Sequence, residues 1–262
     1  MRSTVLNTTQ LAFLEELMIH FGQVMTYEQI APWVPASTAL AKRQFVSQLV
    51  NAGWLVRIKK GVYQVADVSS LGTLTLSRYA IAQILAPGSY VSFEGSLQFH
   101  GFHDQLLQTT TSVSLSQRPA ATLQGYHYRF VKTSEKSYFG FQEANVDGQK
   151  ALIASPEKAL VDMIQLHRSR HSTDWVAEIL LGQQNRIDQK RLLGYLSRCN
   201  LTTQRIFGLL FDTVGFPYDQ QLVASAQQGQ ATSRLTVESN EYNAKWRLYY
   251  TPDLFARYLT PS

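Results

Sequence analysis

Residues 37–65 read STALAKRQFVSQLVNAGWLVRIKKGVYQV, and the spacing of apolar side chains in this stretch changes once, at Gly53. Ser37 or Thr38 can cap a helix that reaches about Ala52, and a glycine at position 53 tolerates the left-handed backbone with which many helices end. One face of this predicted helix gathers apolar side chains at helical spacing: Phe45, Val46, Leu49 and Val50.

A β-hairpin is predicted directly after Gly53, because the apolar period becomes two. Trp54, Val56 and Ile58 alternate there with Leu55, Arg57 and Lys59. Lys59-Lys60-Gly61 is typical of a tight three-residue loop whose glycine takes the left-handed position, and residues 62–65 form the expected return strand.

Two further helices are predicted upstream. The first covers about 9–21, is capped by Thr8 or Thr9, and has one apolar face made of Leu11, Leu14, Met18 and Phe21. The second opens with the capping box Thr26 to Gln29 and stops near Trp33, because Pro32 and Pro35 bracket that residue. Three helices and a hairpin predict a winged helix-turn-helix domain over residues 1–67.

Positive charge is concentrated in this part of the chain. The net charge is +5, and residues 1–66 hold six Lys and Arg against three acids, so they contribute +3 of it. A basic hairpin tip beside a polar helix face favours DNA, although a winged helix can also serve protein contacts alone. The predicted DNA-binding residues are Ser37, Lys42, Arg43, Gln44, Ser47 and Gln48 on the third helix and Arg57, Lys59 and Lys60 on the hairpin.

The composition is that of an ordinary globular protein, with 45% hydrophobic and 16% charged residues among 262. The single cysteine, Cys199, cannot form a disulfide within the chain, so nothing points to an oxidising compartment. No signal peptide or membrane span is visible. We therefore expect a cytoplasmic protein with no membrane partner.

Residues 68–262 are predicted to form a larger mixed domain, which makes the fold class α+β. Residues 67–72 resemble a linker. Ser92 is expected to cap a short helix, and Ser155, Pro156 and Glu157 form a helix start. Further helices are expected at about 77–85, 93–100, 174–182, 188–198 and 202–214, and strands at 110–116, 126–131, 137–141, 151–154 and 248–251.

Catalytic motifs are not evident. His100, His103 and Asp104 are the tightest group of metal-ligand residue types, but their spacing favours local hydrogen bonding over a metal site. Asp147 with Glu157 and Lys158 does not match a metal-dependent nuclease core, because the acid and the lysine are adjacent at a helix start. We assign no catalytic residue, metal or cofactor. A DNA-targeted nuclease and a protein-interaction module remain the alternatives to a DNA-binding regulator.

Four stretches resemble AbiEi-family antitoxins: Leu49–Tyr63, Tyr90–Phe102, Ala154–Asp162 and Tyr242–Leu248. The resemblance implies an antitoxin of a type IV toxin–antitoxin (abortive infection) system. It implies a repressor that binds repeats in its own promoter through the N-terminal domain, with antitoxin activity in the C-terminal domain. The implied partner is a nucleotidyltransferase-like toxin, not necessarily in a stable complex. Symmetric operators suit a monomer pair or a dimer.

Overall fold

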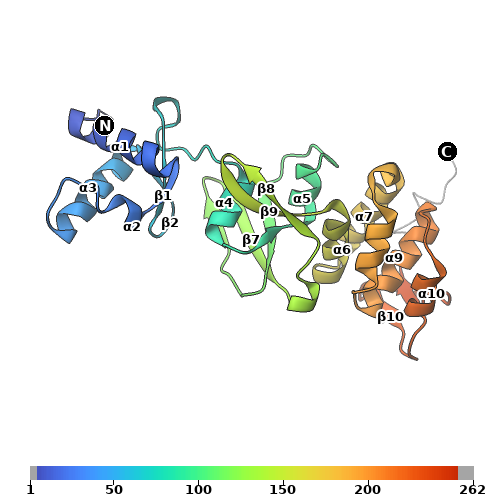
Figure 1. Ribbon diagram of the computed structural model, residues 1–262. Helices are drawn as coiled ribbons and strands as arrows, with labels where there is room; N and C mark the ends of the chain where they lie inside the picture. Colours follow the sequence, from blue (N-terminus) through green and yellow to red (C-terminus); the bar gives the residue numbers. More distant parts are fainter. Residues whose placement is uncertain (1–4, 253–262) are drawn as a thin grey trace.

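The computed structural model describes residues 5–252 and has the predicted α+β class. Figure 1 shows three parts in a row: an N-terminal unit, a central sheet with helices, and a C-terminal group of helices. The buried apolar side chains form three clusters. One lies within the N-terminal unit, one lies on the central sheet and also receives Ile58 from the N-terminal unit, and one joins the C-terminal helices to the other face of the central sheet.

The N-terminal unit contains three helices and a small antiparallel sheet of order β1-β3-β2. Thr26 and Gln29 form the predicted capping box, and Thr38 caps the third helix, which ends at Gly53 in the left-handed conformation. Strand β1, which pairs with β3, was not predicted. The elements are α1 (Thr8–Phe21), β1 (Val24–Thr26), α2 (Tyr27–Ile30), α3 (Ala39–Ala52), β2 (Leu55–Lys59) and β3 (Val62–Val65).

Helix α1 differs from the prediction in its cap and its buried face. Asn7, and not Thr8 or Thr9, closes the capping box with Gln10. The buried side chains are Phe13, Leu14 and Leu17, whereas Leu11 and Met18 are each 48% exposed. Both faces of this helix carry apolar residues, so spacing alone did not distinguish the core face from the outer one.

The β2–β3 hairpin is tighter than predicted. Lys59 still pairs with Val62, so the turn holds only Lys60 and Gly61. Gly61 has a φ of 75°, which a glycine adopts without strain. A bulge between Arg57 and Lys59 bends β2 just before this turn.

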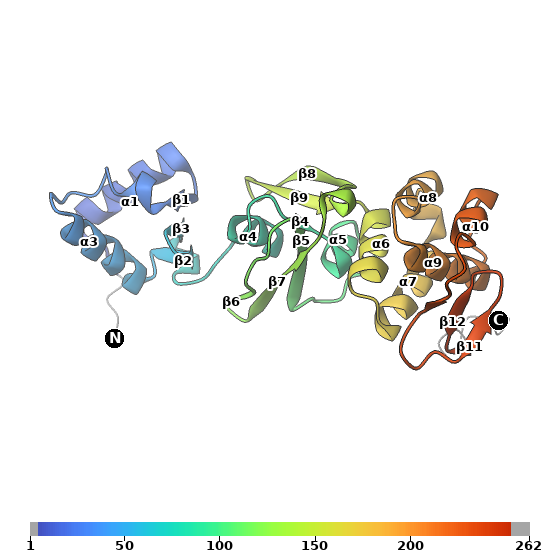
Figure 2. The same cartoon turned by 90° about the horizontal axis from the view of Figure 1, so that it is seen from below.

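The segment predicted as a linker is attached to the N-terminal unit. Asp67 caps a 3-10 helix, Val68–Ser70, and the Gly72 amide donates to the Gly53 carbonyl at 2.9 Å. Gln23 and Gln64 donate from the N-terminal unit to the Thr75 hydroxyl at 2.8 and 2.6 Å. Figure 2 shows the chain passing from β2 and β3 along this connection to the next helix.

A six-stranded mixed sheet of order β6-β7-β5-β4-β9-β8 forms the centre. Helix α4 (Arg78–Leu85) packs on the face that carries Tyr128 and Phe130, and α5 (Phe93–Phe99) packs with α6 (Pro156–Leu166) in the C-terminal cluster. The strands are β4 (Tyr90–Val91), β5 (Thr109–Ser114), β6 (Ala121–Leu123), β7 (Tyr126–Lys132), β8 (Phe141–Val146) and β9 (Gln149–Ala154).

Two local predictions for this region were wrong. The expected strand at 137–141 does not form: Ser137 ends a 3-10 helix, Glu135–Ser137, residues 138–140 are neither helix nor strand, and β8 starts only at Phe141. Ser92 precedes α5 but makes no capping hydrogen bond, because its hydroxyl donates instead to Asp162 at 2.8 Å. Ser155 does cap α6 through the Lys158 amide, with Pro156 at the first turn, as predicted.

The C-terminal group surrounds α9, which is buried along most of its length. A small sheet of order β10-β12-β11 packs beside α9. The elements are α7 (Arg170–Gly182), a 3-10 helix (Gln184–Arg186), α8 (Gln189–Leu196), α9 (Leu201–Val214), α10 (Gln220–Ala226), β10 (Ser233–Arg234), β11 (Glu241–Asn243) and β12 (Leu248–Tyr250).

Candidate nucleic-acid interface

Helix α3 presents a polar face to solvent. Val46 and Leu49 fix its buried side against α1 and the sheet, as the sequence predicts. Arg43, Gln44, Ser47 and Gln48 are exposed, and so is Ser37 just before the helix, while Lys42 is half-buried. Among these side chains are amides, hydroxyls and a guanidinium, the groups that hydrogen-bond base edges and phosphates.

An open groove of about 790 Å³ lies between α3 and the hairpin. It brings together Arg43 and Ser47 of α3 with Arg57 and Lys60 of the hairpin, four of the nine predicted site residues. The two α3 positions are ten or more residues from the two hairpin positions in the chain, and the β2–β3 strands folding back beside α3 place them on one surface. The full lining is Tyr27, Glu28, Arg43, Val46, Ser47, Val50, Asn51, Arg57, Lys60, Gly61 and Tyr63.

The groove carries more positive than negative charge. Arg43, Arg57 and Lys60 face one acid, Glu28, which occupies the first turn of α2. None of the ion pairs within residues 5–252 involves any of these four side chains. The part of the chain that the structure describes therefore leaves these three cations without a neutralising acid, and they can attract an anionic ligand.

Lys59 lies apart from the groove. Its ammonium donates to the Ile84 carbonyl at the C-terminal end of α4, where the helix dipole favours a cation. Burial, and after it the nearby charge of Arg118, lowers the pKa of Lys59. Ser37, Lys42, Gln44 and Gln48 do not line the groove either. Of the predicted residues, four line the groove, four lie outside it, and Lys59 contacts the end of α4.

Four polar side chains of the groove were absent from the predicted set: Tyr27, Glu28, Asn51 and Tyr63. Asn51 shares the outer helical face with Ser47 and Gln44, so the helical period contained a signal for it. Tyr27 and Glu28 follow the Thr26 cap, but no local pattern indicates that α2 faces α3 across a groove. Their inclusion depends on how the helices pack.

A second polar cluster is buried in the central part. Lys158 and Asp162 form an ion pair whose side chains are both 0% exposed, and Tyr90 and Ser92 donate to Asp162 at 3.0 and 2.8 Å. Burial raises the pKa of Asp162, and the Lys158 ammonium opposes that rise. Glu157 is buried too and accepts from the Asp188 amide at 2.9 Å. These contacts join β4, α6 and α8 and have a structural role.

The two histidines of the predicted group contact backbone carbonyls, but only the partner of His103 is near it in the chain, because His100 reaches a residue 54 positions away. His100 Nε2 lies 2.9 Å from the Ala154 carbonyl oxygen, and His103 Nε2 lies 2.9 Å from that of Glu94. Across residues 5–252, no group of three or more His, Cys, Asp or Glu side chains is placed to hold a metal ion.

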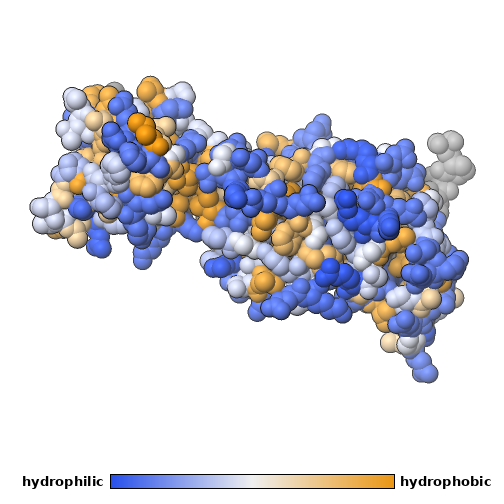
Figure 3. Space-filling view, in the orientation of Figure 1, coloured by the Kyte–Doolittle hydropathy of each residue, from blue (hydrophilic) through white to orange (hydrophobic). Residues whose placement is uncertain are grey.

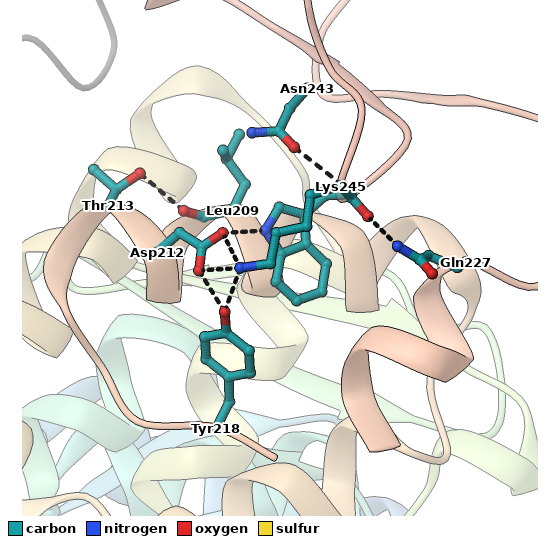
Figure 4. Close-up of polar contacts among 8 residues, drawn as sticks. Leu209, Asp212, Thr213, Tyr218, Gln227, Asn243 and Lys245 are labelled. Carbon is teal, nitrogen blue, oxygen red and sulfur yellow. Dashed lines mark hydrogen bonds and ion pairs between the residues drawn. The ribbon is translucent and has the colours of Figure 1, made fainter. Parts of the chain in front are cut away.

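A third cluster ties the C-terminal sheet to α9 (Figure 4). Asp212 accepts from both Lys245 Nζ, at 2.8 and 2.9 Å, and Trp246 Nε1, at 2.6 Å. Tyr218 donates to the same carboxylate at 2.5 Å. Burial alone would raise the pKa of Asp212, but these hydrogen bonds outweigh it and lower the pKa. Lys245 and Trp246, neighbours in the sequence, thus both contact the Asp212 carboxylate.

No protein-family model matches the sequence, and no curated protein sequence matches it. The fold is similar to the crystal structure of the RV2827C protein from Mycobacterium tuberculosis, with a TM-score of 0.66 over 98% of this chain and 96% of that one. The two sequences are 14% identical, so the likeness is one of fold. Over residues 5–252, no helix has the length and apolar character needed to cross a membrane.

Proposed function

We propose that this chain is a cytoplasmic DNA-binding repressor whose residues 1–67 act as a winged helix. The observation that carries the proposal is the groove between α3 and the hairpin, where Arg43, Arg57 and Lys60 have no ion-pair partners among the described residues, 5–252. The helix–strand–helix–helix–hairpin order of the N-terminal unit supports it.

In this proposal α3 enters the major groove and the hairpin holds the backbone. Ser47, Asn51 and Arg43 line the helix side, where hydrogen bonds to base edges would select the sequence. Arg57 and Lys60 line the hairpin side, where they would contact phosphates without regard to sequence. The hairpin wall thus holds two of the three cations, and the helix wall holds Arg43 together with the uncharged hydrogen-bonding groups.

We further propose that residues 68–262 provide the antitoxin activity of a type IV system, acting against a nucleotidyltransferase-like toxin. The support is the resemblance of four stretches to AbiEi-family antitoxins. Three of these stretches supply buried side chains that make polar contacts in the larger part: Tyr90 and Ser92, Lys158 and Asp162, and Trp246. The resemblance there lies in residues that hold the fold together.

The DNA half of the proposal is tested by removing the hairpin cations. Arg57→Ala combined with Lys60→Ala should weaken binding to a duplex from upstream of the gene and to random duplex alike. The slope of log affinity against log salt should become shallower by about two, since each lost phosphate contact removes about 0.9. Fluorescence anisotropy at several salt concentrations measures both quantities.

A matched control removes one Arg and one Lys elsewhere. Arg168 and Lys190 are exposed in the C-terminal half, so Arg168→Ala with Lys190→Ala changes the net charge equally. If the two double variants lose equal affinity, the effect is one of overall charge and the groove is not the site.

The antitoxin half is tested by expressing the chain with the toxin encoded by the neighbouring gene. Growth should be restored by the wild type and also by the Arg57→Ala, Lys60→Ala variant, because repression and antitoxin activity reside in different parts. Loss of rescue in that variant, at equal protein level, would contradict the separation of the two activities.

A further inference from the structure

A second group of cations lies at one end of the central sheet. Strands β5 and β7 are parallel, and Ser114 at the end of β5 pairs with Lys132 at the end of β7. The chain leaves β5 at this end and passes through Arg118 before β6. Arg118 and Lys132 are both exposed, and neither has an ion-pair partner within residues 5–252.

The alternation along β7 places Lys132 on the face that meets the N-terminal unit. Tyr128 and Phe130 are buried in the cluster that also contains Ile58 and the residues of α4. Because side chains two residues apart share a face, Lys132 follows them on that side of the sheet. Arg129, which points the other way, lines a different cleft beside α7.

The hairpin reaches the same end of the sheet. Lys59 contacts the Ile84 carbonyl at the end of α4, and the chain then turns into β4, where Tyr90 pairs with Val113 of β5. Arg118 is close enough for its charge to add to the lowering of the pKa of Lys59 that burial causes. Lys60, the next residue along, lines the DNA groove. Lys60 at the groove, Lys59 at the end of α4 and Arg118 near the end of β5 therefore follow one another along this side of the protein.

We infer that Arg118 and Lys132 form a second phosphate-binding patch, across which a DNA duplex seated in the groove continues. The inference rests on the proposed function, because the groove fixes where the duplex enters. The charge of Arg118 acts on Lys59, so these like charges repel, and the phosphates of a duplex would relieve that repulsion. Lys132 stands at the same end of the sheet, opposite the residue from which the chain leaves β5 toward Arg118. The larger part of the chain thus contributes directly to DNA affinity.

The test compares two duplexes, a short one that fills only the groove and a longer one that extends past it. Arg118→Ala with Lys132→Ala should weaken binding of the full-length protein to the longer duplex roughly tenfold and make its salt slope shallower by about two. Binding to the short duplex should not change. The charge-conserving pair Arg118→Lys and Lys132→Arg should restore binding to the longer duplex.

Three controls separate the outcomes. The Arg168→Ala, Lys190→Ala variant should bind both duplexes as the wild type does, and circular dichroism should show equal thermal unfolding for all variants. If the Arg118, Lys132 variant binds the longer duplex as this control does, the patch is refuted while the groove stands. If the Arg57→Ala, Lys60→Ala variant also binds both duplexes normally, the proposed function itself has failed.

Discussion

At the scale of the residue, Glu28 is the one acid among the lining residues of a groove that also holds three cations. Its carboxylate repels phosphates but can accept a hydrogen bond from the exocyclic amine of cytosine. Glu28→Gln should therefore tighten binding to random duplex severalfold while reducing the preference for the natural site. Competition binding with the two duplexes measures the ratio of the affinity for the natural site to the affinity for random duplex. If this ratio does not change, Glu28 does not contact the bases.

At the scale of the element, α9 and the turn before β12 interlock at one glycine. A Cβ on Gly208 would lie 2.2 Å from the Trp246 ring, which is fully buried and hydrogen-bonded to Asp212. Gly208→Ala should lower the free energy of unfolding by about 3 kcal/mol, because the ring cannot move without losing that contact. Gly194→Ala on α8 has no atom within 4 Å of the new carbon, so it should stabilise by up to about 1 kcal/mol. Urea unfolding of both variants measures the change in the free energy of unfolding. A change of the same sign in the two variants would contradict this packing.

At the scale of the whole molecule, the N-terminal unit is docked on the central sheet. Ile58 is 2% exposed and packs with α4, and Figure 3 shows hydrophobic surface in the narrow region between the two parts. Ile58→Ala should cost about 3 kcal/mol and expose the connection at residues 67–76 to protease, since the docking contact is lost. Leu40→Ala, at a 67% exposed site, should change neither property. Limited proteolysis followed by mass spectrometry locates the cuts, and protection of the connection in the Ile58 variant would show that docking depends on other contacts.

The sequence by itself determined the local features of this protein. The caps at Thr26, Thr38 and Ser155, the end of α3 at Gly53 and the polar outer face of α3 are all found as predicted. Each depends on residues within one or two helical turns, so periodicity and capping chemistry are sufficient to locate it.

Only the tertiary structure decided which residues share a surface. It assigned Lys59 to the end of α4, 25 residues away, and Ser92 to Asp162, 70 residues away. It also chose the buried face of α1 and brought Glu28 into the groove. The physical reason is that these contacts form when separate elements pack together, and the free energy of that packing depends on partners that no local pattern identifies.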